Sequence, residues 1–404
     1  MSETKILFAR QPIYNCELGV EGYELLYRPM TQEDVFDDDK ATSQVVMNTF
    51  MEVGLTKATE SSQAFINFPE SWLLSPPPFE PHAVVIEVLE SVPVNANVIS
   101  AVKALKDSGY RIALDDFEYD DSKSPLIELA DIIKLDVLVH RGEALDKLVH
   151  QLKPFNKVLL AEKVEDYQLF SRCQELGFTL FQGYFLCRPQ IVQGQVLPAN
   201  KLVVMRLLAD LQNPDISIKD LENSIANDPT LGVKLLKVIN SAQYAIAQKV
   251  ESLQKAIVLL GLQKLKAWAS MIALFKLSDK PSELLTLTLT RAKMLELMAQ
   301  ETRKANPDKF FTVGLFSSVD AFFDQEKSTI LESLPLEKDI GDALLEYKGE
   351  AGILLKACIH HEQGEWNQIP WSDLNAMGID EETLEKAYFD GLRWALDVMS
   401  SLLK

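Results

Sequence analysis

The sequence predicts two domains, an α/β domain over residues 1–195 and an all-α domain over residues 196–404. Two observations carry this prediction. Up to about residue 190, short apolar runs rich in β-branched and aromatic residues alternate with amphipathic stretches, which is the pattern of strands and helices that share one sheet. After Pro189 these runs stop and helical periodicity continues. The length agrees, because 404 residues exceed what one hydrophobic core ordinarily holds.

The first domain is predicted to contain a buried strand in each of its short apolar runs. These runs lie at residues 5–10, 23–27, 64–68, 83–90, 111–117, 131–137, 157–164 and 179–185. Two amphipathic stretches between them end at Gly109 and Gly177, and glycine commonly stops a helix before the next strand. Repeated strand–helix units form a parallel sheet, which is either doubly wound or closed into a barrel.

The second domain follows a linker predicted near residues 190–200, which holds turn residues and lacks a strong hydrophobic period. Beyond it, segments such as 200–212 and 231–242 have the periodicity of helices. The segment 252–277 is too long and too apolar for one surface helix, so we expect two helices broken near Gly261. The acidic run at 33–40 is expected to be a solvated loop.

The composition excludes several classes of protein. The chain has 40 Lys and Arg against 59 Asp and Glu, a net charge of −19, so it is a poor binder of nucleic acid polymers. No stretch approaches the roughly 20 apolar residues that span a bilayer, and the N-terminus lacks the apolar core of a secretory signal. The cysteines are scattered, as expected of reduced thiols in a cytoplasmic protein. They are Cys16, Cys173, Cys187 and Cys358.

Polar side chains interrupt the apolar runs near the carboxyl ends of most predicted strands. They are Glu24, Arg28, Asn67, Glu87, Glu90, Asp115, Asp116, Lys134, Glu162, Glu165 and Gln182. In a barrel, the carboxyl ends of the strands meet on one face, which is where active sites of such folds lie. We therefore expect several carboxylates, an amide and a lysine to converge there.

Converging carboxylates predict a metal site, because they repel one another unless a cation lies between them. All-oxygen ligands favour Mg²⁺ or Mn²⁺, and such ions can clamp the attacking and leaving oxygens of a phosphodiester. Lys134 would then offset charge on the phosphate or hold the attacking water. The alternatives are that single acidic residues after strands cap helices or are solvated, and that the set is a vestigial site kept only by descent.

With these residues in view, residues 5–195 resemble an EAL domain, the fold of the cyclic di-GMP phosphodiesterases. The motifs that carry the resemblance are Glu24-Leu25-Leu26 with Arg28, Asn67, the E-x-x-E pair Glu87 and Glu90, Asp115-Asp116-Phe117, Lys134-Leu135-Asp136, the run from Ala161 to Glu165, and Gln182-Gly183-Tyr184 followed by Arg188-Pro189. Each motif alone is weak evidence. Their order along about half of the chain is specific.

The resemblance implies an EAL-type (β/α) barrel and a role for each matched residue. Mg²⁺ or Mn²⁺ would be held by Glu24, Asn67, Glu87, Asp115 and Asp116. Lys134 and Glu162 would be the catalytic residues that serve the attacking water. Arg28 and Gln182 would touch the ligand, and Glu90 would brace the loop after the Asp-Asp-Phe motif.

The chain departs from the family pattern around this loop. Active members continue with a Gly-Thr-Gly type of loop, whereas this chain has residues 118–124 without glycine and so loses easy access to positive φ. Pro29 replaces the usual aromatic residue, and Lys163 replaces the glycine of A-E-G-V-E. The loop also carries three carboxylates against Lys123, which repel a ligand with two phosphates. We therefore expect binding and hydrolysis of cyclic di-GMP to be weak or absent compared with an intact EAL enzyme.

The second half resembles an HDOD domain, a helical relative of the HD-GYP phosphohydrolases. The resemblance rests on Asn227-Asp228-Pro229, Asn240-Ser241-Ala242 and the run 256–261. It implies a helical bundle that acts as a protein-interaction or regulatory module. The Asn240-Ser241 pair is expected to cap a helix.

No metal is expected in this HDOD domain. An HD-type site needs spaced histidines and a His-Asp dyad, but Ser317-Ser318 stand where the dyad would follow an apolar helix. His360 and His361 are adjacent, so on a helix they point about 100° apart and would not chelate one ion together. Both are expected to be surface or boundary residues.

Two hypotheses for function follow. The first is a signal-transduction protein of the cyclic di-GMP network, whose divergent EAL domain retains the metal ligands and whose HDOD domain binds a protein or regulates. The alternative is an active metal-dependent cyclic di-GMP phosphodiesterase regulated by the HDOD domain. A homodimer is left open. A hydrolase that acts through Cys or Ser is disfavoured, because no nucleophile lies near a convincing His and acid pair.

Overall fold

The structure is a computed structural model, and it describes residues 6–29, 59–60, 62–75, 77, 79–190, 198–213, 215–226, 228–240, 250, 252–277, 280–304 and 306–403. The acidic run at 33–40 and most of the predicted linker lie outside the described residues. The chain divides into two compact units, residues 1–186 with 362–364 and the remainder, so each is considered by itself.

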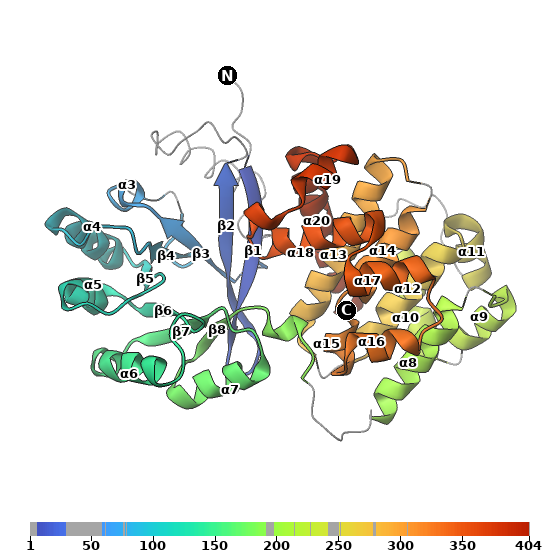
Figure 1. Cartoon of the computed structure of the whole chain (residues 1–404), viewed down its shortest axis with the longest axis horizontal. Coiled ribbons are helices and arrows are strands. Elements are labelled where there is room, and N and C mark those ends of the chain that lie inside the picture. The colour runs from blue at the N-terminus through green and yellow to red at the C-terminus, as the bar shows by residue number, and fades with distance from the viewer. Residues whose placement is uncertain are drawn as a thin grey trace. The chain divides into compact units, whose positions relative to one another are not determined.

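The first unit is a closed eight-stranded barrel with strand order β1 to β8, which confirms the predicted EAL-type architecture (Figure 1). All of the predicted strands are present. Their bounds are β1 (Ile6–Asn15), β2 (Val20–Pro29), β3 (Gln63–Phe68), β4 (Val84–Val88), β5 (Arg111–Leu114), β6 (Ile132–Asp136), β7 (Val158–Glu162) and β8 (Leu180–Gln182). The described helices are α3 (Glu70–Leu73), α4 (Ala96–Asp107), α5 (Ser124–Leu129), α6 (Glu143–Leu152) and α7 (Tyr167–Leu176).

The first strand runs against the others, so the expectation of a wholly parallel sheet is wrong for β1. It pairs antiparallel with both β2 and β8, whereas the pairs from β2 to β8 are parallel. Only residues 16–19 connect β1 to β2, and a parallel neighbour would need a much longer crossover. The Asn15 side chain closes this turn, because its Oδ1 accepts hydrogen bonds from the amides of Glu17 and Gly19, both at 2.9 Å.

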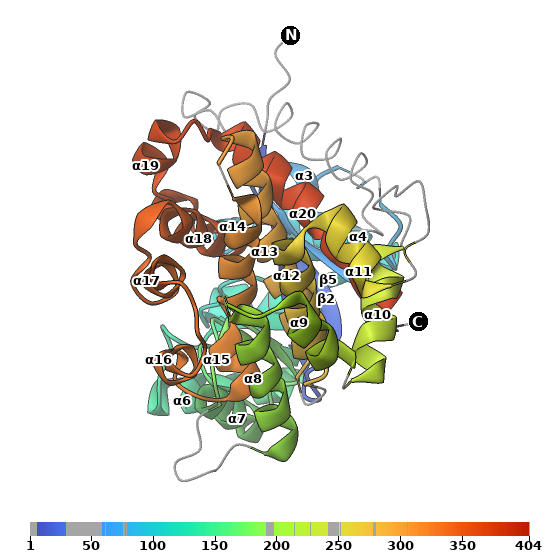
Figure 2. The same cartoon turned by 90° about the vertical axis from the view of Figure 1, so that its right-hand side faces the viewer.

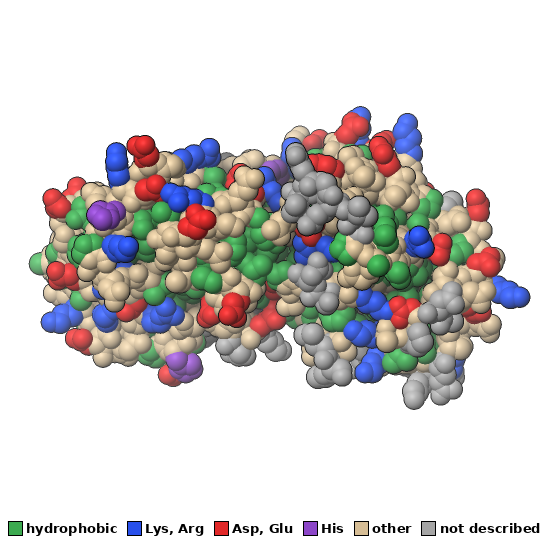
Figure 3. Space-filling view, turned by 90° about the horizontal axis from the view of Figure 1, so that it is seen from below, with side chains coloured by type: hydrophobic (Ala, Val, Ile, Leu, Met, Phe, Trp, Pro, Cys, Tyr) green, Lys and Arg blue, Asp and Glu red, His purple; other side chains and the backbone are tan. Residues whose placement is uncertain are grey.

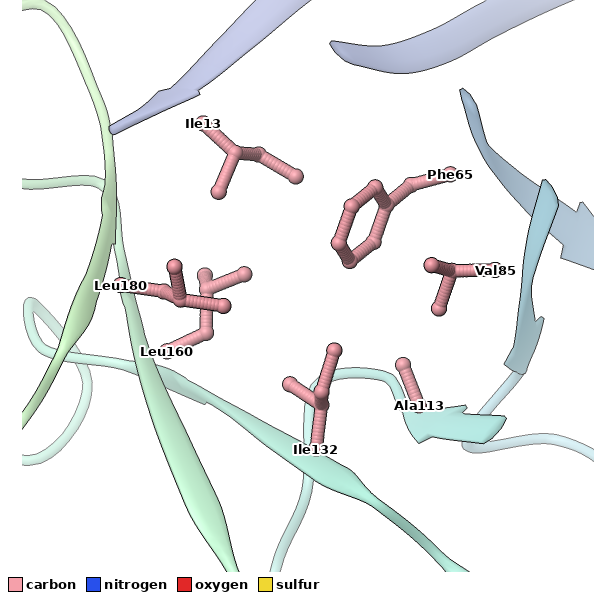
Figure 4. Close-up of a cluster of buried hydrophobic side chains, with 7 residues drawn as sticks. All are labelled: Ile13, Phe65, Val85, Ala113, Ile132, Leu160 and Leu180. Atoms are coloured by element: carbon pink, nitrogen blue, oxygen red, sulfur yellow. The ribbon is translucent and has the colours of Figure 1, made fainter. Parts of the chain in front are cut away.

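One layer of apolar side chains fills the barrel (Figure 4). Seven strands each contribute one buried residue: Ile13, Phe65, Val85, Ala113, Ile132, Leu160 and Leu180. In β2 the position opposite Ile13 is Gly22, and a Cβ there would lie 2.7 Å from the ring of Phe65. Phe65 therefore occupies the space that a side chain from β2 would need. This layer is the floor beneath the polar residues described below.

The outer helices start and stop as the sequence predicts. Asn95 and Asp166 cap α4 and α7 by accepting a hydrogen bond from the amide three residues on. Gly109 and Gly177, with φ of 96° and 101°, reverse the chain after these helices. The caps thus fix where each helix leaves and rejoins the barrel.

The second unit is helical (Figures 1 and 2). Its described helices are α8 (Ala199–Gln212), α9 (Ile218–Ala226), α10 (Pro229–Ile239), α11 (Leu253–Leu260), α12 (Leu262–Phe275), α13 (Ser282–Glu301), α14 (Pro307–Phe316), α15 (Val319–Phe323), α16 (Lys327–Glu332), α17 (Lys338–Glu346), α18 (Gly349–Glu362), α19 (Trp371–Ala376) and α20 (Glu381–Leu403). Helix α13 packs against both α14 and α20 and forms the centre of the unit. The predicted break at Gly261 is confirmed, because this residue separates α11 from α12 with φ of 84°.

The surface carries charges of both signs. On the face drawn in Figure 3, acidic and basic side chains are interspersed with hydrophobic ones. Within the described ranges, no helix combines the length and the apolar character that crossing a membrane requires.

Candidate functional site

A polar layer lies directly above the apolar floor, at the carboxyl ends of the strands. Six of its residues stand two positions beyond a floor residue, and Glu24 stands two positions beyond Gly22 of β2, so the period of two in a strand points them into the barrel. The layer consists of Glu24, Asn67, Glu87, Asp115, Lys134, Glu162 and Gln182. These are seven of the residues that the sequence singled out.

The ammonium of Lys134 lies at the centre of this layer. Its Nζ is 2.6 Å from Asp115 Oδ1, 2.7 Å from Glu87 Oε1, 3.0 Å from Glu162 Oε1 and 3.4 Å from Glu24 Oε2. The contact with Glu87 is close but lacks the alignment of a hydrogen bond. Lys134 and Glu87 are fully buried. One cation thus faces four carboxylates away from solvent.

Two amides hold Glu24 in place. Gln182 Nε2 donates to Glu24 Oε2 at 2.6 Å, and Asn67 Nδ2 donates to Glu24 Oε1 at 3.1 Å. Gln182 Nε2 also lies 3.0 Å from Oε1 of Gln11, a residue of β1 that the sequence analysis missed. Because β1 is antiparallel, the polar layer is reached two residues before Ile13 instead of two after it. A lone glutamine in an apolar strand was the available signal.

Burial and charge shift the protonation equilibria of the layer. Burial, together with the charge of Glu24, raises the pKa of Glu87 well above its usual value, and burial likewise raises that of Asp115. Burial raises the pKa of Glu162 to about 8 against the opposing effect of Lys134. Burial would also raise the pKa of Glu24, but Lys134 and the two amides outweigh it and the pKa is lowered. Burial lowers the pKa of Lys134, yet its carboxylate neighbours raise it well above the usual range.

The donor set fits a divalent cation. One oxygen from each of Glu24, Glu87 and Asp115 lies within 4.8 Å of the others, and within the described residues this is the one such group of three. In the described part of the chain, Asn67 Oδ1, Glu87 Oε2 and Glu162 Oε2 are buried without a hydrogen-bond partner, while Glu87 Oε1 faces the Lys134 ammonium. Buried oxygens without donors are costly unless a cation satisfies them. Oxygen ligands of this kind suit Mg²⁺ or Mn²⁺.

The loop after β5 keeps its attachment to the barrel without glycine. Asp116 adopts φ of 41°, in the left-handed region, although it is not a glycine. The next residue, Phe117, is buried and its amide donates to the carbonyl oxygen of Lys134 at 3.1 Å. The first two side chains of the Asp-Asp-Phe motif therefore point in different directions. Asp115 points into the polar layer, while Asp116 is exposed at its rim.

Three predicted residues lie apart from the buried layer or cannot be assigned to it. The backbone of Arg28 ends β2, but its side chain lies outside the described residues. Glu90 is exposed in the turn after β4. Asp116 is exposed, as noted above. The bracing role of Glu90, the ligand contact of Arg28 and the metal contact of Asp116 stay predictions.

In the helical unit, an arginine occupies the place beside Ser317 and Ser318. Arg291 on α13 is buried, and its Nη1 donates to Ser317 Oγ at 2.7 Å and to Ser318 Oγ at 3.2 Å. The two serines thus join α13 to the end of α14. A guanidinium held there repels a metal cation rather than binding one.

The expectation that both histidines lie at the surface or its boundary is wrong for His361. This side chain is fully buried between the rings of Trp366 and Tyr388, with Nε2 at 3.1 Å from Glu385 Oε2. His360 is partly buried, and its Nδ1 lies 2.8 Å from Glu365 Oε2. Adjacent residues of a helix face different environments, and here one of the two faces the core. Asn240 ends α10 as a cap, while Ser241 lies outside the described residues.

The buried carboxyl of Glu162 predicts a pH dependence of stability. Its folded pKa of about 8 lies above the usual 4.5, so the folded protein binds the proton more tightly and loses stability as pH rises from about 5 to 8. Glu87 and Asp115, whose pKa values are also raised, change stability in the same direction as Glu162, whereas Glu24, with a lowered pKa, acts only below this window and Lys134 acts above it. For chelator-treated protein we expect a loss of about 2–4 kcal/mol across the window, from the free energy equivalent of a pKa unit.

Urea denaturation at a series of pH values checks this. In Glu162→Gln, which mimics the protonated acid, the same series should be flatter by the share that Glu162 contributes, while the shares of Glu87 and Asp115 remain. Added Mg²⁺ should stabilise the natural protein more at pH 8 than at pH 6, because the ion competes with the proton. A natural protein whose stability rises from pH 5 to 8 would contradict the assignment.

Comparison with known proteins identifies the class to which this fold and site belong. The EAL domain model matches residues 47–189, and the HDOD domain model matches residues 197–324. The chain is 34% identical over 411 residues to the uncharacterized protein YuxH of Bacillus subtilis (strain 168), covering 98% of this chain and 100% of YuxH. It is 32% identical over 402 residues to the cyclic di-GMP phosphodiesterase CdgJ of Vibrio cholerae serotype O1, covering 96% of this chain and 92% of CdgJ.

Two solved structures are similar to part of the chain. BlrP1 of Klebsiella pneumoniae, in complex with manganese and cyclic di-GMP at pH 6, matches with a TM-score of 0.37 and 23% identity over 46% of this chain and 56% of that one. The FimX EAL domain of Pseudomonas aeruginosa, bound to cyclic di-GMP, matches with a TM-score of 0.35 and 17% identity over 45% of this chain and 89% of that one. The chain belongs to the same family as YuxH and CdgJ, and it carries an EAL domain followed by an HDOD domain.

Proposed function

We propose that this chain is a metal-dependent phosphodiesterase that opens cyclic di-GMP to its linear form. The observation that carries the proposal is the buried layer in which oxygens of Glu24, Glu87 and Asp115 lie within 4.8 Å of one another beside Lys134. The family relationship to CdgJ, a cyclic di-GMP phosphodiesterase, supports it. The expectation of weak or absent hydrolysis stays a prediction, and what favours the active enzyme is that Asp115, just before the loop without glycine, still contacts Lys134 in the layer.

The residues of the site would have separate roles in binding the ion and the nucleotide. Glu24, Asn67, Glu87 and Asp115 would hold Mg²⁺ or Mn²⁺ from within the barrel, with Asp116 at the rim. When bound, the ion would lower the pKa of water and offset charge on the phosphate. Gln182 would orient Glu24 and contact the ligand, and Arg28 would contact it as well.

Glu162 is suited to accept the proton of the attacking water. Its Oε2 is buried without a hydrogen-bond partner among the described residues, so this oxygen is available to a water molecule. The water oxygen would form a bond to phosphorus while one phosphorus–oxygen ester bond of the ring breaks, and the leaving ribose oxygen would take up a proton from solvent to become a hydroxyl group. Lys134, fixed by Glu162 and Asp115, would offset the negative charge that develops on the phosphate oxygens.

A second candidate is a signalling protein in which the EAL domain binds the nucleotide without turning it over. The loop after β5 favours this reading, because Glu118, Asp120 and Asp121 place negative charge beside the site. The HDOD domain would then carry the function by binding a protein. We also propose, for either function, a domain boundary near residues 190–200 and a cytoplasmic location.

The test is incubation of the purified chain with cyclic di-GMP and Mg²⁺ or Mn²⁺, followed by chromatography of the products. We expect stoichiometric conversion to the linear dinucleotide, loss of conversion in excess EDTA, and recovery when the ion is restored. Glu24→Gln should lower turnover at least about 100-fold, because it removes a charged metal ligand without changing the shape of the side chain. Tight binding of intact nucleotide without any product would favour the second candidate instead.

A further inference from the structure

One residue at the mouth of the barrel adopts a backbone conformation that favours glycine. Lys163 directly follows Glu162 at the end of β7, and its φ of 57° lies in the left-handed region. A side chain is disfavoured there, and strain of this kind persists mainly where surrounding contacts or function require the residue. The strained backbone at Lys163 therefore indicates that its side chain makes a contact or serves a function.

The ammonium of Lys163 is held at a fixed place while it faces solvent. Its Nζ donates to Asp136 Oδ2 at 2.5 Å, and the side chain of Lys163 is 55% exposed. Asp136 is itself anchored, because its Oδ1 accepts hydrogen bonds from the amides of Leu138 and Val139 at 2.8 and 3.1 Å. Across the described residues, Asp136 is the one hydrogen-bond partner of this Nζ, so two N–H donors point elsewhere.

The ammonium of Lys163 stays protonated and lies beside the polar layer. Burial lowers the pKa of its ammonium, but Asp136, Asp116 and Glu162 outweigh that effect and the pKa is raised. Lys163 directly follows Glu162, and its partner Asp136 is paired with Glu162 across β6 and β7, so the ammonium lies beside the polar layer. In the described loops after β5 and β7, the other cation is Lys123, which lies 5.3 Å from the ring centre of Phe117.

We propose that Lys163 binds the phosphate of cyclic di-GMP that is not cleaved. The inference rests on the proposed function, in which the buried layer takes one of the ligand's two phosphates. The second phosphate then lies at the mouth, where Glu118, Asp120 and Asp121 would repel it. An exposed, oriented ammonium offsets this repulsion and donates charge-assisted hydrogen bonds. Lys163 is thus a ligand-positioning residue that compensates for the acidic loop.

The test compares three variants with the natural chain. Lys163→Asn removes the charge with a residue that tolerates positive φ, and Lys163→Arg keeps the charge. Lys147→Asn is the matched control, because Lys147 is exposed on α6 and its loss changes net charge equally. Calorimetry with Mg²⁺ measures affinity for linear diguanylate, the product of the proposed reaction, and initial rates give KM and kcat for cyclic di-GMP.

We expect Lys163→Asn to weaken the affinity for linear diguanylate about tenfold and to raise KM by a similar factor, the usual effect of one charge-assisted hydrogen bond. Its kcat should change less than about threefold, because the reacting phosphate is held by other residues. Lys163→Arg and Lys147→Asn should stay within about threefold of the natural chain in both measures. The affinity of the natural chain should also fall more steeply with salt than that of Lys163→Asn.

The outcomes separate this inference from the function on which it rests. Equal affinity and KM in Lys163→Asn and the natural chain would overturn the role of Lys163 and leave the proposed function standing. A lower melting temperature of Lys163→Asn with unchanged affinity would assign the residue a structural role instead, which also overturns the inference. A natural chain that binds neither linear diguanylate nor cyclic di-GMP would overturn both.

Discussion

Replacing Lys134 by methionine is expected to lower turnover of cyclic di-GMP at least about 1,000-fold and to destabilise the barrel by about 3–5 kcal/mol. Both effects have one cause. The ammonium faces four carboxylates at 2.6–3.4 Å and is fully buried, so its removal leaves those charges without a cation and removes the charge proposed to face the phosphate. Methionine preserves much of the length and the apolar stem of the side chain.

Stability and activity of Lys134→Met should respond differently to metal. Urea denaturation with and without Mg²⁺ should show that the ion restores more stability in the variant than in the natural chain, because it supplies the missing charge. Turnover should not return. Lys266→Met is the matched control: Lys266 is also buried, yet its Nζ donates only to the carbonyl of Asn213 in its described contacts. That variant should keep full turnover. A Lys134→Met protein within tenfold of natural turnover would contradict the proposed role.

The site was predictable because its residues obey the simplest rule of a strand. Glu87 follows Val85 by two positions, as Lys134 follows Ile132, so polar residues at the same step past the floor of each parallel strand must point inward together. The sequence of each strand therefore predicts which residues form the polar layer. The sequence does not predict that Lys134 lies at the centre of the layer, because the distances between strands depend on the closure of the barrel.

The errors come from information that local patterns lack. Hydrophobic periodicity identifies β1 as a strand but has no direction, so it gave neither the antiparallel pairing nor Gln11 as a neighbour of Gln182. The four-residue connection at 16–19 was the available clue to direction. His361 was misjudged because its burial depends on Trp366 and Tyr388, which pack against it from other segments. Adjacency in sequence excluded a shared metal ion but said nothing of which histidine faces the core.

Glycine at position 314 should be indispensable to the helical unit. A Cβ on Gly314 of α14 would lie 2.4 Å from Cα and 2.7 Å from N of Ala292 on α13, both backbone atoms that trimming a side chain cannot move. Gly314→Ala must therefore push α14 away from α13, and we expect it to destabilise this unit by about 3 kcal/mol, at the upper end of overpacking effects. The displacement would also strain the hydrogen bonds from Arg291 to Ser317 and Ser318.

Gly341→Ala provides the matched control for this prediction. Gly341 lies within α17, and nothing comes within 4 Å of a Cβ built on it, so the same substitution there should stabilise by about 0.5–1 kcal/mol through helix propensity. Thermal denaturation of the full chain should thus move in opposite directions for the two variants. Equal melting temperatures for Gly314→Ala and the natural chain would mean that α13 and α14 can separate without cost. In that case the close packing of α13 against α14 would not be what holds Arg291 against Ser317 and Ser318.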